Sequence, residues 1–227
     1  MKTKDQKTQG FSLAELMVVM SLLLLIFMLS YQLFIPGIEI IKRGEGNIES
    51  QQNAFLTLNS LGMQLRESNY RSFLFRKMDG KDIDVYSFPQ NQRISIKAIS
   101  FLSALDSDNQ FCYDGATGRP EWQEFVIYHL AFQDKVKNIN RYTLYRKTFK
   151  GSIYHLPALG PVLIRSIDLD KVLEAKDKGR VIARNVTRIE FFDPSLSQIG
   201  ITVGTSGNNP KGFPEESVIS TKILLRN

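Results

Sequence analysis

Glu15 is the ionisable residue whose position most requires a chemical explanation. It is the only charged residue in the apolar stretch FSLAELMVVMSLLLLIF. A carboxylate inside a bilayer is costly unless a partner compensates it. A cut after Gly10 would give Phe11 a new terminal amine four residues before Glu15, and the amine and carboxylate of staggered neighbouring chains could then neutralise each other. Within one chain, the first-turn N–H groups of a helix also favour a carboxylate. Alternatively, Glu15 is solvated at the level of the lipid headgroups.

The two histidines, His129 and His155, are the first candidates for enzymatic chemistry. A Ser/His/Asp triad would need one of them beside an exposed nucleophile. No Gly-x-Ser-x-Gly occurs, because GTSGN at residues 204–208 lacks the second glycine at the required spacing. The histidines are therefore expected to be structural or on the surface, and the sequence predicts no catalytic residues.

Paired aspartates are the only pattern that could hold a metal ion. Asp106 with Asp108, and Asp168 with Asp170, could give oxygen ligands to calcium, which takes six to eight of them. The sequence DSDNQF lacks the glycine and distal glutamate of an EF-hand loop. Turn formation and helix capping explain the two pairs better, so no metal ligands and no cofactor are predicted.

Three further patterns have ordinary structural explanations. Trp122 lies near other aromatic residues and could mark a partner surface, but aromatics at strand spacing are more often core. Basic residues over 141–150 could meet DNA, yet their alternation with apolar residues favours the solvated side of a strand. Asn185 begins an Asn-Val-Thr sequon to which we attach no function.

Composition is that of a folded protein with an amino-terminal appendage. The 227 residues are 43% hydrophobic and 23% charged, with a net charge of +6. Residues 1–10 contribute +2 of that charge, so their removal would leave +4. A net charge of this size is too small to indicate a nucleic-acid-binding protein. Cys112 is the only cysteine, which excludes an internal disulfide and a cysteine-based zinc site.

The run from Leu16 to Ile38 is 23 residues long and carries no charge. As a helix it would measure about 34 Å, enough to cross a hydrocarbon core. Three lysines before the run favour an amino terminus in the cytoplasm, although Lys42 and Arg43 behind it weaken the asymmetry. A cleaved secretory signal is the competing interpretation, but no Ala-x-Ala site follows the run and the run is too long. The sequence therefore predicts a retained helix.

The segment GFSLAE, residues 10–15, with the LMVVMSLLLLIF that follows it, resembles the class III signal of type IV pilins and type II secretion pseudopilins. The resemblance implies that a prepilin peptidase cleaves after Gly10 and N-methylates Phe11, and that Glu15 guides assembly. It covers residues 1–35. Ala14 replaces a larger aliphatic residue, and Pro36 lies four residues later than the proline of many major pilins, which leaves the helix bend open.

The remaining sequence predicts a second helical segment and then strands. Ala54, Leu58, Leu61 and Leu65 have helical spacing and predict a helix over about 47–70, after the glycines and proline of 36–46 that loosen helical continuity. β-branched and aromatic residues then predict four or five antiparallel strands. The candidate strands are 93–105, 124–132, 141–149, 180–192 and 217–226, with a hairpin loop between Phe132 and Arg141. A short helix is expected at about 168–177.

The expected fold class is α+β and type IV pilin-like, with a long amino-terminal helix followed by an antiparallel sheet. The expected organisation is a cleaved leader (1–10), a transmembrane or filament-core helix (11–38), the periplasmic part of that helix (39–70) and a mainly β periplasmic head (71–227). The pattern of strands resembles a J-type minor pseudopilin or W-type minor pilin.

The resemblance implies a structural role, not an enzyme. We expect a minor pilin or pseudopilin of a type IV pilus or type II secretion system, in the tip complex that initiates assembly. Its expected partners are the prepilin peptidase, other minor and major subunits and the inner-membrane assembly platform. It would sit in the bacterial inner membrane with its head in the periplasm. Calcium is conceivable by family analogy only. The alternatives are a competence pilin that assists DNA uptake and, less favoured, a signal-anchored periplasmic enzyme.

Overall fold

The computed structural model describes residues 12–105, 110–118, 120–121, 124–149, 173, 179–195, 197–207 and 216–225. The chain divides into two compact units, Met1–Glu45 and Gly46–Asn227. We treat the first as an amino-terminal helical segment and refer to the second as the head.

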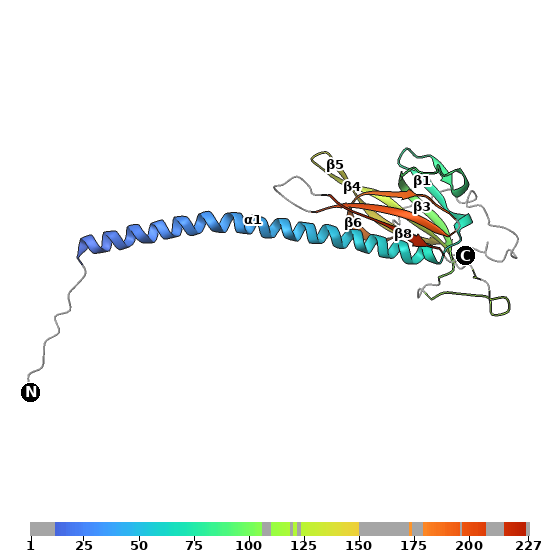
Figure 1. Cartoon of the computed structure of the whole chain (residues 1–227), viewed down its shortest axis with the longest axis horizontal. Coiled ribbons are helices and arrows are strands. Elements are labelled where there is room, and N and C mark those ends of the chain that lie inside the picture. The colour runs from blue at the N-terminus through green and yellow to red at the C-terminus, as the bar shows by residue number, and fades with distance from the viewer. Residues whose placement is uncertain are drawn as a thin grey trace, which may run out of the picture. The chain divides into compact units, whose positions relative to one another are not determined.

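One long helix, α1 (Leu13–Arg66), contributes to both units (Figure 1). In the amino-terminal unit, no described residue from Ser12 to Glu45 is buried. In the head, one face of α1 is buried: Ala54, Leu61 and Leu65 are fully covered. The helical spacing read from the sequence is therefore the spacing of the residues that meet the core. The helix ends at Arg66, and a single 3-10 turn, η1 (Tyr70–Ser72), follows.

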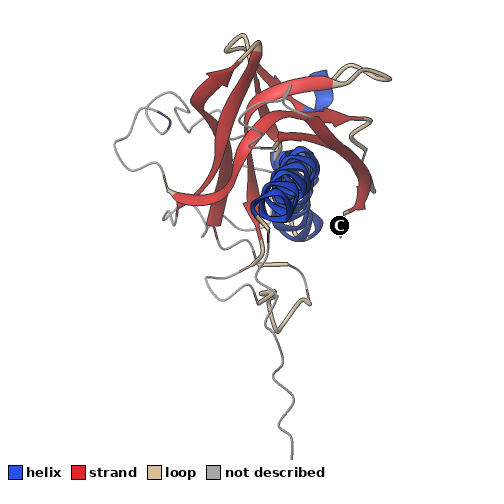
Figure 2. Cartoon of the chain, turned by 90° about the vertical axis from the view of Figure 1, so that its left-hand side faces the viewer, coloured by secondary structure: helices blue, strands red, loops and turns tan. Residues whose placement is uncertain are grey.

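The described residues of the head form eight strands in one antiparallel sheet, in the order β2-β1-β3-β4-β5-β6-β7-β8. The sheet curves around the head part of α1 (Figure 2), and the start of β3 also pairs with the end of β6. A 3-10 turn, η2 (Val85–Ser87), separates β2 from β3. The strands are β1 (Leu74–Lys77), β2 (Asp82–Asp84), β3 (Ile94–Ser103), β4 (Glu124–Val136), β5 (Ile139–Phe149), β6 (Arg180–Phe192), β7 (Gln198–Ser206) and β8 (Glu216–Leu224).

The core lies between the sheet and the buried face of α1. Aromatic rings fill one end of it: Phe73 packs edge-on against Phe75 and Phe101, and Phe75 contacts Phe191. Aliphatic residues of β7 complete the core: Ile199, Ile201 and Val203 are fully buried, and Ile201 lies opposite Phe191 in the sheet. Such dense apolar burial supplies most of the free energy that holds a helix on a sheet.

Polar contacts fix where α1 lies on the sheet. Ser50 Oγ donates to the carbonyl oxygen of Thr205 at 3.0 Å, and Thr205 Oγ1 donates to the carbonyl oxygen of Ser50 at 2.7 Å. Farther along the helix, the hydroxyls of Ser60 and Tyr128 lie 3.0 Å apart. Burial raises the pKa of Tyr128. These bonds satisfy buried polar groups that would otherwise be costly.

The α+β architecture predicted from the sequence is confirmed, but the number of strands was wrong. The part of the chain that the structure describes contains eight strands, where four or five were expected. β1 and β2 are too short to show an alternating pattern. β7 was missed because Gly200 and Gly204 interrupt its β-branched residues. A side chain at Gly200 would meet the Phe192 ring at 2.3 Å, so this glycine serves close packing inside the sheet.

The loop between β4 and β5 is also shorter than predicted. The strands continue to Val136 and resume at Ile139, which leaves a two-residue turn. Lys137 takes the left-handed conformation there, with φ of 53°. Two-residue hairpin turns require this conformation. The sequence has no Asn-Gly pair here, which is the pattern that would have predicted such a turn.

Candidate functional site

Ser12 and Glu15 form the start of α1. The Glu15 backbone N–H donates to Ser12 Oγ at 3.3 Å, and the Ser12 backbone N–H donates to Glu15 Oε2 at 2.9 Å. Ser12 Oγ also lies 3.1 Å from Oε2. This reciprocal arrangement is a capping box, which satisfies N–H groups that have no partner inside the helix.

The carboxylate of Glu15 therefore has polar partners within its own chain. Both of its bonds within the described residues end on Oε2, so Oε1 can accept from a further donor. The first turn of a helix also presents a positive partial charge. Glu15 thus remains hydrogen-bonded as a monomer while keeping one oxygen for a cation. Gly10 and Phe11, the other predicted site residues, lie outside the described residues.

The role of Ser12 was missed although the sequence contained its signal. A Ser-x-x-Glu pattern just ahead of an apolar run is the signature of a capping box. The predicted site rested on the glutamate and its distance from Phe11 and did not include the serine. The structure adds Ser12 to the candidate site as the residue that orients Glu15.

An apolar surface follows Glu15 along α1. The large apolar side chains from Leu13 to Ile41 have exposed fractions between 38%, at Ile38, and 80%, at Leu13. The helix is long and apolar enough to cross a membrane. Exposure of so many apolar side chains to water would be unfavourable, so this segment requires lipid or other protein around it.

Other candidate residues lie in the head. His129 is buried, with its ring stacked on Tyr145 at 5.4 Å, which agrees with the structural role expected for it. The expectation that the basic residues of β5 are solvated was wrong for Arg141 and Lys147, which are both buried. Arg141 Nε donates to Asp134 Oδ1 at 2.7 Å, and this ion pair explains how the guanidinium can be buried.

Asn185 of the sequon is buried and occupies a bulge in β6. Its backbone has φ of 57°, and its N–H donates to Gln133 Oε1 at 3.3 Å. Its side-chain amide donates to Glu49 Oε1 of α1 at 3.4 Å. Asn185 therefore serves to join β4, β6 and α1.

The remaining candidates cannot be placed. His155, Trp122, both aspartate pairs and most of the helix expected at 168–177 lie outside the described residues. Among the described residues, no group of three or more His, Cys, Asp or Glu side chains could hold a metal ion.

Comparison with known families decides what the amino-terminal segment is. Residues 5–31 match the family described as "Prokaryotic N-terminal methylation motif". The chain carries a class III signal. This segment includes the capping box and the first part of the apolar helix, and it supports a type IV pilin-like protein. No curated protein and no solved structure matches the chain.

The motif assigns a general role to the candidate site. Proteins with this signal are processed by a prepilin peptidase, and the pilin-like proteins that carry it have structural roles. Together with the exposed apolar helix, the signal indicates membrane anchoring and assembly with pilin-like proteins.

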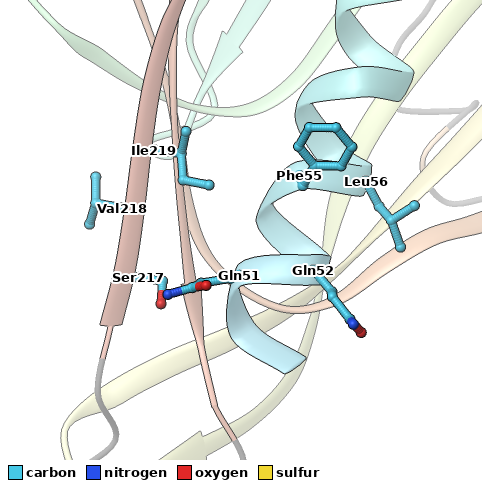
Figure 3. Close-up of a pocket in the computed structure, with 7 residues that line it drawn as sticks. All are labelled: Gln51, Gln52, Phe55, Leu56, Ser217, Val218 and Ile219. Atoms are coloured by element: carbon cyan, nitrogen blue, oxygen red, sulfur yellow. The ribbon is translucent and has the colours of Figure 1, made fainter. Parts of the chain in front are cut away.

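A groove of about 750 Å³ lies in the head, between α1 and β8 (Figure 3). Phe55 of α1 and Ile219 of β8 face each other across it, while Val218 points away from the helix. The lining residues carry no charge: Gln51, Gln52, Phe55, Leu56, Ser217, Val218 and Ile219. Phe55 is 65% exposed, so this groove is a second apolar surface, separate from the amino-terminal segment.

Proposed function

We propose that the chain is a minor pilin or pseudopilin, a structural subunit of a type IV pilus or type II secretion pseudopilus that acts in the tip complex initiating assembly. The observation that carries this proposal is the methylation motif over residues 5–31, placed on an apolar helix of which no described residue is buried before Gly46. The prepilin peptidase cleaves the precursor after Gly10 and N-methylates Phe11.

Glu15 directs assembly in this proposal. Before assembly its carboxylate is held by Ser12, at the start of its own helix. During assembly Oε1 accepts the methylated amine of Phe11 from a neighbouring subunit, which compensates the charge inside the filament. The apolar face of α1 exchanges lipid for neighbouring helices, so extraction from the membrane replaces one apolar environment with another.

The head lies in the periplasm and the helix crosses the inner membrane once. Charge supports this orientation, because three lysines precede the apolar run and favour a cytoplasmic amino terminus. The partners are other minor and major subunits and the inner-membrane assembly platform.

Mass spectrometry of the amino terminus tests the proposal. Protein extracted from the membranes of its host should begin with N-methylphenylalanine at Phe11. An intact Met1, or a terminus beyond residue 30, would contradict the proposed processing. A peptidase-deficient host supplies the control, because the same protein should there retain its leader.

A Glu15→Ala variant tests the assembly role separately. Processing at Gly10 should continue, because the variant keeps the glycine and the apolar run, while incorporation into filaments should be lost. Glu45→Ala removes another exposed acidic side chain of α1 and should assemble normally. Full assembly of the Glu15 variant would refute the pairing.

A further inference from the structure

Strand β8 forms one edge of the sheet, and within the described residues it is neither short nor bulged nor covered by another strand. It pairs with β7 over nine consecutive residues without a bulge, and no described strand lies on its other side. The opposite edge, β2, has only three residues and runs directly into a 3-10 turn. Long, regular edges are templates for pairing with another chain, whereas short edges are not. The two edges of this sheet therefore differ in their capacity to bind a strand.

The apolar groove lies beside this edge. Ile219 projects from β8 into the groove opposite Phe55, and the groove lining is uncharged. A strand added to β8 would hydrogen-bond along the edge and place alternate side chains over the groove. Edge hydrogen bonding for affinity, with a pocket for alternate side chains, is how strand addition works in peptide recognition.

The positions of the charged residues in β8 indicate which strand could pair with its free edge. Charged side chains occur only near its two ends, at Glu216 and Lys222, and both residues are exposed. The Glu216 carboxylate also accepts from Thr187 Oγ1 at 2.5 Å and lies 3.4 Å from Arg188 Nε in its own chain. An antiparallel copy of β8, centred on Ile219, places Glu216 of each chain opposite Lys222 of the other. Side chains directly opposite each other in an antiparallel pair lie on one face, about 5 Å apart, so both contacts are attractive. The strand is thus complementary to itself.

We propose that the β8 edge binds the β8 edge of a second copy of this chain, forming a twofold dimer. The two Ile219 side chains meet at the symmetry axis and cover the apolar grooves of both copies. Such an interface is isologous, with the same surface on both subunits. The dimer does not depend on the proposed function, because it concerns the head alone, whereas its relation to a filament rests on that function.

The direction of β8 relative to α1 determines how the helices of the two chains are oriented in the dimer. Gly46 lies against Gly207 near the start of β8, and a Cβ added at Gly62 would lie 3.4 Å from Ile223 Cδ1 near its end. The head part of α1 and β8 therefore run in the same direction. An antiparallel β8 pair therefore sets the head portions of the two α1 helices antiparallel. Subunits assembled through parallel helices cannot keep this contact, so the dimer is a form outside a filament that protects the exposed edge.

Charge reversal tests the dimer, using the full chain purified in detergent and sedimentation to measure association. Wild type should dimerise, whereas Glu216→Lys and Lys222→Glu should each associate about tenfold more weakly, because each variant faces like charges at two contacts. An equimolar mixture of the two variants should recover dimers, since each Lys then faces a Glu. Lys135→Glu, the same change as Lys222→Glu at an exposed residue of β4, is the matched control and should dimerise like wild type.

Three results would overturn the proposal. They are a monomeric wild type, a dimer insensitive to both reversals, or a mixture that stays as weakly associated as the single variants. The rescue also separates the interface from folding, because Glu216 lies 3.4 Å from Arg188 within its own chain and its loss alone could weaken the strand.

Discussion

The hydrogen bonds between Ser12 and Glu15 both cap the start of α1 and provide donors for the Glu15 carboxylate. The first turn of any helix has N–H groups without helical partners, and a carboxylate in apolar surroundings needs donors. Their reciprocal bonds answer both demands at the point where the apolar helix begins. The acid at the centre of the proposed assembly mechanism is therefore also a structural part of the helix start.

Replacing Ser12 by alanine should weaken this helix start. The variant loses the hydroxyl that accepts from the Glu15 N–H, at a cost of about 1 kcal/mol, which corresponds to roughly fivefold faster hydrogen exchange in the first turn. Exchange measured on the chain in detergent micelles checks this. Ser12→Thr keeps a hydroxyl and should retain most of the protection. Equal exchange rates in all three proteins would show that the capping box contributes nothing.

Gly207 illustrates a residue chosen for the absence of a side chain. A Cβ at this position would lie 2.4 Å from the carbonyl oxygen of Gly46, where α1 enters the head. Gly207→Ala should lower the free energy of unfolding by about 1–3 kcal/mol, because backbone must move to admit the methyl group. Gly115→Ala is the control, since nothing lies within 4 Å of the position that its methyl group would take. Urea unfolding distinguishes them, and equal stability would contradict the close approach.

At the scale of elements, the hairpin of β4 and β5 is held near its turn by an ion pair. Asp134 accepts from the buried guanidinium of Arg141, and this hydrogen bond lowers the pKa of Asp134. A carboxyl group with a lowered pKa stabilises the folded state above its ordinary pKa of about 4, and that contribution disappears as pH falls through the lowered value.

The pH dependence of the free energy of unfolding tests the contribution of this ion pair. Urea unfolding of wild type should show stability decreasing as pH falls below about 4. Asp134→Asn should be less stable at neutral pH, because it leaves Arg141 buried without its anion, and should lose less stability on acidification. If both proteins respond to acid identically, the ion pair does not contribute through its protonation.

The elements also show what a sequence can reveal. The apolar run and the spacing of Ala54, Leu61 and Leu65 were sufficient to predict both parts of α1, because helical periodicity repeats over many residues. The expectation that the proline and glycines of 36–46 loosen the helix was wrong, since α1 is continuous from Leu13 to Arg66. β7 could not be found that way, because the reason for Gly200 appears only in the folded sheet. There the ring of Phe192 in β6 occupies the space that a side chain at Gly200 would take. The same holds for the functional surfaces. Glu15 and its neighbours could be recognised from adjacent residues in the sequence, whereas the groove is lined by Phe55 and Ile219, which come together only after folding.

At the scale of the whole molecule, the two units depend on different surroundings. The described residues before Gly46 have no buried member, whereas the core of the head extends from Ala54 to Ile223. The first unit needs lipid or other subunits to cover it, and the head provides its own core. We therefore expect the boundary at Glu45 to separate a part that is stable only when covered from a part that is stable alone.

A truncated chain tests this division. Residues 46–227 should be soluble without detergent and unfold cooperatively, with a free energy of unfolding within about 0.5 kcal/mol of that of the full chain in detergent, because distant changes to exposed residues have small effects. A chain of residues 67–227 should not fold, because it loses Ala54, Leu61 and Leu65 and leaves the apolar face of the sheet uncovered. Circular dichroism against urea measures both. An unfolded 46–227 chain would show that the amino-terminal segment stabilises the head, and a cooperatively folding 67–227 chain would show that the sheet does not require α1.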